Sequence, residues 1–126
     1  MASPMLTIDT SDPATRDPAL DAVAAAPEHH TVLYEDDNVR VISVSIPPGG
    51  IEKPHHHRWP SVFVIDSMVK VTDHDGDGNE IPLPVPDRFE PPLIVKMEPQ
   101  AVHFVRNDDS RAFHGTRIEY KRGYTA

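Results

Sequence analysis

Short runs rich in Val and Ile dominate the chain from Tyr34 onward, and polar turn sequences separate them. The runs are VRVISVSI at 39–46, SVFVIDSMVKV at 61–71, PLIVKM at 92–97, VHFVRN at 102–107 and GTRIEY at 115–120. The turn sequences include EDDN, PPGG, DHDGDGN and RNDDS. No helical period of useful length follows residue 28, so the pattern predicts an all-β domain, built as a β-sandwich or a small barrel.

Residues 1–28 differ in composition from the rest of the chain. They contain four prolines, five acidic residues and one basic residue, and DAVAAAP is their only hint of a helical turn. Such a segment cannot bury enough apolar surface to fold alone. We therefore expect a mostly extended N-terminal arm or tail over 1–28 and a single β-barrel domain over 29–126, since 126 residues leave no room for a second core.

Charge and composition narrow the classes of partner and chemistry. The net charge of −8 argues against a nucleic acid or an anionic membrane as partner, because such surfaces need clustered Lys and Arg. The chain has no apolar run near 18 residues, and its start lacks the features of a secretory signal, so we expect a cytoplasmic protein. With no cysteine and eight histidines, any transition-metal site must use His and carboxylate ligands.

The stretch GGIEKPHHHRWPS, at 49–61, places three histidines in a row. Successive side chains of a strand point to opposite faces, so in an extended segment His55 and His57 share one face and His56 lies on the other. The face of His55 also carries the large aromatic residues and is the better candidate for the interior; its further members are Trp59, Ser61, Phe63 and Ile65. Two histidines at i and i+2 can bind one metal ion if a third ligand comes from elsewhere.

His103 is the candidate for the third ligand, because it lies within the strand-like segment AVHFV and needs a partner when buried. Other interpretations remain open for these residues. His55 and His57 could face solvent at a polar strand end, and His103 could be a buried histidine bonded to a carbonyl. We expect His29, His30 and His56 to be exposed.

The sequence resembles the cupins, a family of jelly-roll barrels. The first cupin motif is Gly, five residues and His-x-His, followed by Glu and Gly; Gly49, His55 and His57 match it. The Glu position holds Ser61 or Val62, and the closing Gly is also absent. In PQAVHFVRN, His103 matches the second motif, as do Pro99 and Asn107. The runs LYEDDNVRVISVSIPPGG and RIEYK also resemble small bacterial single-domain cupins.

The resemblance, which covers roughly residues 29–122, implies a cupin-type double-stranded β-helix and a metal site made of His55, His57 and His103. A typical cupin site adds a Glu, and a serine occupies that position here, so the site resembles the three-His centres of some cupin thiol and diketone dioxygenases. The metal would be Fe, Zn, Ni or Mn. We expect Ser61, Trp59, Phe63 and Phe104 to line the pocket, and the extra positive charge of a Glu-less centre to favour an anionic ligand.

Two classes of function follow. The first is a metal-dependent, dioxygenase-like enzyme that acts on a small organic acid or a diketone-like metabolite. The second is a non-catalytic small-ligand-binding or sensor cupin with a degenerate or empty metal site, which the missing Glu favours. Glu52, Ser61 and Arg106 are the nearest polar residues in sequence to the His set, and none has a spacing that demands an acid or base role.

Two further expectations concern the surface. The stretch DHDGDGNE at 73–80 copies the first half of a calcium loop, but position 12 is Pro84 and no helices flank it, so we expect a β-turn. Small cupins usually pair through an edge strand and an N-terminal arm. We therefore expect a homodimer in which residues 1–28 order against the partner's sheet.

Overall fold

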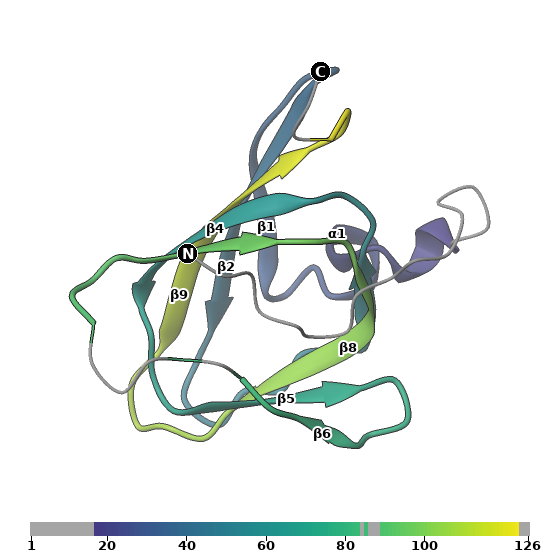
Figure 1. Cartoon of the computed structure of the whole chain (residues 1–126). Helices are drawn as coiled ribbons and strands as arrows, with labels where there is room; N and C mark the ends of the chain where they lie inside the picture. Colours follow the sequence, from purple (N-terminus) through teal and green to yellow (C-terminus); the bar gives the residue numbers. More distant parts are fainter. Residues whose placement is uncertain (1–16, 84, 86–88, 124–126) are drawn as a thin grey trace.

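The computed structural model describes residues 17–83, 85 and 89–123, and in them two antiparallel sheets form a barrel (Figure 1). The five-stranded sheet has the order β1-β2-β9-β4-β7, and the four-stranded sheet has the order β3-β8-β5-β6. The strands of the described part are β1 (His30–Glu35), β2 (Val39–Ile46), β3 (His55–His57), β4 (Ser61–Ser67), β5 (Val71–Asp75), β6 (Glu80–Ile81), β7 (Leu93–Met97), β8 (Gln100–Asn107) and β9 (Phe113–Tyr120). The predicted all-β architecture is confirmed.

Most of the predicted runs coincide with strands. The run 39–46 is β2 itself, and the run 115–120 forms most of β9. The run 61–71 differs, because β4 ends at Ser67 and Val71 already begins β5 in the other sheet. The segment between β3 and β4 also crosses from one sheet to the other, so residues 55–65 are two short strands rather than one extended segment.

The apolar core lies between the sheets. The inward side chains of the long strands alternate with outward ones, as the burial of every second residue in β9 shows. The buried apolar cluster consists of Ile42, Val44, Ile46, Phe63, Ile65, Val69, Leu93, Met97 and Phe113. Gly115 is part of this packing, because a Cβ atom at this position would lie only 2.4 Å from Cε1 of Phe63.

The calcium-like stretch forms the turn of the β5–β6 hairpin, as the sequence predicts. Gly78 has a φ of 88°, which favours glycine, and its N–H donates to the Asp75 carbonyl. The Asp75 carboxylate accepts from the backbone N–H groups of Asp77 and Asn79, each at 2.9 Å. These hydrogen bonds use the carboxylate within the turn itself.

The described part of the N-terminal segment folds against the barrel of its own chain. It forms a 3₁₀ turn, η2 (Pro18–Leu20), and one helical turn, α1 (Ala22–Ala25), drawn in purple in Figure 1. Ala22 and Ala26 are fully buried, and Asp21 forms a parallel bridge with His56. Residues 1–16 of the predicted arm lie outside the described residues. No helix of the described chain is long and apolar enough to span a membrane.

Candidate metal centre

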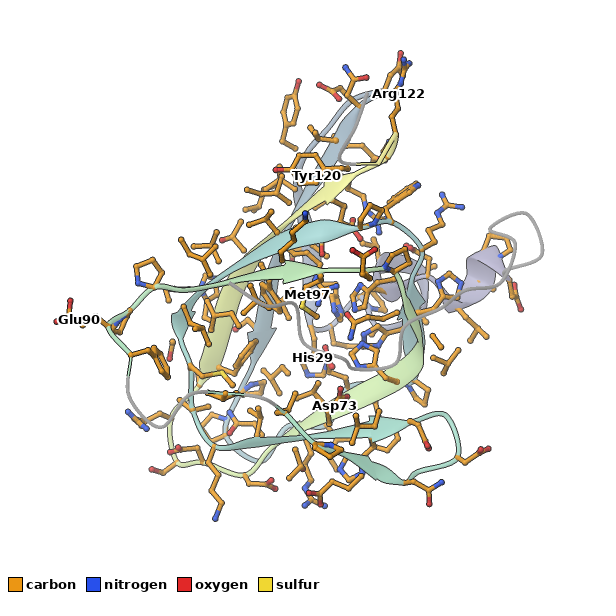
Figure 2. All side chains as sticks on the ribbon, in the orientation of Figure 1. His29, Asp73, Glu90, Met97, Tyr120 and Arg122 are labelled. Atoms are coloured by element: carbon orange, nitrogen blue, oxygen red, sulfur yellow. The ribbon has the colours of Figure 1, made fainter. Side chains whose placement is uncertain are left out.

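Four histidines from three strands converge inside the barrel: His30 from β1, His55 and His57 from β3, and His103 from β8. The candidate ligand atoms of His30, His55 and His57 all lie within 4.8 Å of one another. The ring centroid of His103 lies 4.8 Å from that of His55 and 5.2 Å from that of His57. None of the four is more than 4% exposed. In Figure 2, nitrogen-bearing side chains gather inside the barrel beside the purple N-terminal segment.

Strand pairing places these rings together. His55 pairs with His103 across the antiparallel β3–β8 ladder, and an irregularity in the register then places His57 opposite Gln100. His55 and His57 share the inner face because they are two residues apart, and the irregularity brings Gln100 as well as His103 to the buried side of β8. His30 starts β1, after the α1 turn, where the chain enters the edge of the five-stranded sheet.

Hydrogen bonds fix the orientation of three of the imidazoles. In each of the three, Nδ1 faces an oxygen that can only accept, so Nδ1 carries the proton of the neutral ring. The three bonds are His30 Nδ1 to the Ala26 carbonyl at 3.0 Å, His55 Nδ1 to the Lys53 carbonyl at 2.7 Å, and His103 Nδ1 to Asp73 Oδ1 at 2.8 Å. In the neutral form of each ring Nδ1–H is the single N–H, so Nε2 keeps a lone pair. Metal-binding histidines are typically held by such bonds.

Several of the nitrogen atoms in the cluster have no hydrogen-bond partner among the described residues. They are His55 Nε2, His57 Nδ1 and His103 Nε2, all of them buried. Leaving a polar atom buried and unpaired costs about 1–3 kcal/mol. Several such atoms in one cluster are compatible with a metal ion or another polar species at its centre.

Burial keeps the imidazoles neutral. Desolvation lowers the pKa of His30 to about 4, and it lowers the pKa values of His55 and His57 well below the ordinary value. The nearby Arg117 guanidinium lowers the pKa of His57 further. At neutral pH these rings are therefore lone-pair donors rather than cations, which is the state that binds a metal ion.

A buried carboxylate, Glu52, lies beside the histidines. Its Oε2 is 3.3 Å from His30 Nε2 and its Oε1 is 4.0 Å from His55 Nε2. Oε1 also accepts from the Val105 N–H at 3.0 Å. Desolvation raises the pKa of Glu52 to about 7. This residue was only one of three polar neighbours in the sequence, and the fold brings it into direct contact with the cluster.

The opposite wall of the interior is also polar. Arg117 and Glu119 of β9 are buried, and Arg117 Nη1 donates to Gln100 Oε1 at 3.0 Å, which joins the two sheets. The Arg117 guanidinium lies 4.6 Å from the centroid of the Phe63 ring. Ser61 pairs with Glu119 across the β4–β9 ladder. A ligand bound between the sheets would thus meet a cation and an amide on this side.

The structure brings the predicted ligands His55, His57 and His103 together. Of the predicted pocket residues, Ser61 and Phe63 are buried on the inner face of β4. The other two lie elsewhere: Phe104 stacks on His74 with ring centroids 4.8 Å apart, and Trp59 lies beneath the cations of Arg58, Arg40 and Lys121. Phe104 follows His103 directly on β8 and therefore faces the opposite side of the sheet.

The expected exposure of His30 and His56 is wrong. His30 is buried in the cluster, and no periodic pattern signals this, because the rest of its strand is exposed. His56 points away from the cluster as predicted, but the N-terminal segment covers it and its Nε2 lies 2.7 Å from the Asp17 carbonyl oxygen. Strand parity gives the face of a residue, whereas the covering of that face depends on distant segments of the chain.

Comparisons with known proteins identify the fold. No protein-family model matches the chain, and no curated protein matches it. A solved structure of a cupin domain from Bordetella pertussis Tohama I is similar, with a TM-score of 0.61 and 22% identity over 73% of this chain and 91% of that one.

Two further solved structures share the arrangement. A conserved protein with a double-stranded β-helix domain from Klebsiella pneumoniae gives a TM-score of 0.54 at 18% identity, covering 77% of this chain and 78% of that one. An RmlC-like cupin family protein from Methanocaldococcus jannaschii gives 0.54 at 13% identity, covering 72% and 77%. The chain therefore has the double-stranded β-helix fold of the cupins.

Proposed function

We propose that the protein binds a divalent transition metal through the histidine cluster and uses this centre to bind a small molecule inside the barrel. His55 and His57 would be ligands, with His103 and His30 completing the set. The observation that carries the proposal is His55: its Nδ1 donates to the Lys53 carbonyl at 2.7 Å, and its buried Nε2 has no hydrogen-bond partner among the described residues.

The buried charges support a dication. Four carboxylates and two guanidinium groups are buried in the described chain: Asp21, Glu52, Asp73, Glu119, Arg40 and Arg117. With all four carboxylates ionised and His30, His55 and His57 neutral, this set would carry two negative charges in excess. Burial raises the pKa of Glu52 to about 7, so its full ionisation at neutral pH calls for a cation beside it. Buried charges are normally paired or bound to metal, and one divalent ion would neutralise the excess.

The donor set agrees with Fe, Zn, Ni or Mn, because neutral imidazoles bind these ions. When bound, such an ion supplies Lewis acidity and open positions for the oxygen atoms of a small organic acid or a diketone-like metabolite. Arg117 would orient an anionic group of that ligand, and Gln100 would hold Arg117 in place through the bond between them. In this form the protein is a metal-dependent, dioxygenase-like enzyme.

A second candidate is a binding or sensor module without catalysis. One observation favours this candidate: one oxygen of each of two carboxylates near the cluster already accepts a hydrogen bond, Asp73 Oδ1 from His103 and Glu119 Oε1 from Arg40. A general base needs an oxygen within reach of the substrate's proton. The same metal centre would then hold a ligand without transforming it.

Elemental analysis of untagged protein, purified without added metal, tests the proposal. We expect close to one transition-metal ion per chain and loss of this ion in His55→Ala. Sub-stoichiometric amounts of several metals would support the binding module with a degenerate site. Oxygen consumption, measured after small organic acids and diketones are added under air, distinguishes a dioxygenase-like enzyme from a non-catalytic binding module.

We also propose a homodimer. β1 forms one edge of the five-stranded sheet, and it exposes Val32, Leu33 and Tyr34, which are 39%, 59% and 56% accessible. An exposed apolar edge strand is suited to pairing with a second copy about a two-fold axis. A single sedimenting species of 14.0 kDa at micromolar concentration would contradict this assembly.

A further inference from the structure

We propose that Glu52 is a ligand of the metal centre and supplies the carboxylate that the first motif lacks at Ser61. This inference rests on the proposed metal binding. Glu52 lies three residues before His55, outside the positions at which the motif has an acid. It therefore enters the cluster from the loop that precedes β3 rather than from β4.

The contact between Glu52 and His30 needs either a proton or a metal ion. His30 uses its Nδ1 proton on the Ala26 carbonyl, so its Nε2 is an acceptor. Glu52 Oε2, another acceptor when ionised, lies only 3.3 Å away. Two acceptors at this separation are stable only with a positive charge between them or beside them, either a proton or a metal ion.

A proton alone would satisfy only this pair. It would leave His55 Nε2, which is 4.0 Å from Glu52 Oε1, without a partner among the described residues. The buried Nε2 of His103 would also remain without one. A metal ion held by His30, His55 and His57, whose ligand atoms lie within 4.8 Å of one another, would have Glu52 and His103 beside it as further ligands. The charge of the carboxylate would offset half of a dication's charge.

The backbone holds Glu52 in this position. Its N–H donates to the Val105 carbonyl at 3.0 Å, and the Val105 N–H donates back to Glu52 Oε1, also at 3.0 Å. The residue is 4% exposed. β8 thus fixes both the backbone and one carboxylate oxygen, while the second oxygen points to His30. Pre-organisation of this kind is typical of a metal ligand.

The test uses Glu52→Gln with Co²⁺ as the probe ion. The glutamine oxygen can still accept from the Val105 N–H, and its amide can donate to His30 Nε2, so the metal-free variant should melt at or above the wild-type temperature. We expect its Co²⁺ affinity to fall by roughly 100-fold or more, beyond the range typical of an outer-shell partner. The visible absorption bands of bound Co²⁺ should also shift, because a donor atom has changed.

Asp73→Asn is the charge-matched control. It removes one buried negative charge beside the cluster, while the asparagine oxygen still accepts from His103 Nδ1. We expect a smaller loss of Co²⁺ affinity with unchanged absorption bands, since no ligand is removed. Equal losses in the two variants, with wild-type bands in both, would show that Glu52 acts only through its charge and would overturn the assignment.

The other outcomes separate this inference from the proposed function. If wild-type protein binds Co²⁺, His55→Ala does not, and Glu52→Gln binds with wild-type affinity and bands, the metal centre stands and Glu52 is not its ligand. If wild-type protein fails to bind Co²⁺, Zn²⁺ or Fe²⁺, the metal centre itself is refuted. A lower melting temperature of metal-free Glu52→Gln would contradict the argument that two acceptors face each other.

Discussion

The two ends of the barrel interior are equally buried and chemically opposite. At one end, the inward rows of paired residues across β2, β9, β4 and β7 are apolar, with Ile46 opposite Phe113 and Ile65 opposite Leu93. His30 of the edge strand β1 joins the second row, opposite Val44. At the other end, the equivalent row contains Arg40, Glu119 and Ser61. The histidine cluster of the four-stranded sheet faces this polar side, beside Arg117.

This difference separates the residues that stabilise the fold from those proposed to bind the metal ion and its ligand. Burying apolar area contributes about 25 cal/mol per Å², so the apolar end stabilises the barrel without any further requirement. The polar end has to overcome the desolvation of charges and of unpaired nitrogens, and apolar residues of similar size would be at least as stable there. Local departures of this kind from the best choice for stability are typical of functional sites.

The polar end is closed by a buried charge network. The guanidinium of Arg40 donates to both carboxylate oxygens of Asp21, at 2.9 and 3.0 Å, and to Oε1 of Glu119. Asp21 belongs to the N-terminal segment and Glu119 to the barrel wall. The network therefore attaches the segment that also positions His30, through Ala26, to the interior of the barrel.

The largest effect should come from removing a ligand at the polar end. His55→Ala and His57→Ala should each lower Zn²⁺ affinity by about 100-fold or more, because ligand loss exceeds the loss of an outer-shell partner. His56→Ala is the matched control and should stay within a few-fold of wild type, since His56 contacts the Asp17 carbonyl rather than the cluster. Calorimetric titration measures all three. Loss of Zn²⁺ binding in His56→Ala alone would mean that the assigned strand register is wrong by one residue.

Arg40→Met should destabilise the protein by about 3–5 kcal/mol, because it leaves Asp21 and Glu119 buried without their cation. Denaturant unfolding measures the change. Lys121→Met is the control: Lys121 also lies over the Trp59 ring, at 5.4 Å, but the side chain of its partner Glu35 is 42% exposed and can be solvated alone, so the loss should stay below about 1 kcal/mol. Similar losses in both variants would mean that stacking on Trp59, rather than the buried charges, stabilises this end.

Ile46→Ala tests the apolar end. Ile46 is 1% exposed in the core, and truncation to Ala should cost about 2–5 kcal/mol in free energy of unfolding. Metal affinity should change little, because Ile46 pairs with Phe113 and its row contains no histidine of the cluster; His30 pairs with Val44, one row nearer to the polar end. A large loss of affinity in folded Ile46→Ala would show that the two ends are coupled and that the division between them is wrong.

The sequence predicts the fold better than the site. The Val- and Ile-rich run of β2 predicts a strand, and Ile42, Val44 and Ile46 are buried on its inner face. In β9 the inner face carries the polar residues Arg117 and Glu119, which the apolar pattern does not predict. The motif residues His55, His57 and His103 also meet as expected. Glu52 and His30 could not be assigned in the same way, because their contacts depend on how the loop before β3 and the α1 turn pack onto β8 and β1. Neither packing leaves a periodic signal in the sequence.

The smallest effect is expected from Gly115→Ala, at the boundary between the two ends. The new Cβ would lie 2.4 Å from Cε1 of Phe63, whose ring also carries the Arg117 guanidinium at 4.6 Å. Overpacking of this kind typically costs about 1–3 kcal/mol. Phe63→Leu removes the clashing ring atoms, so the double variant should be more stable than the sum of the two single losses predicts. Additive losses, measured by denaturant unfolding, would show that the Phe63 ring does not limit the space at Gly115.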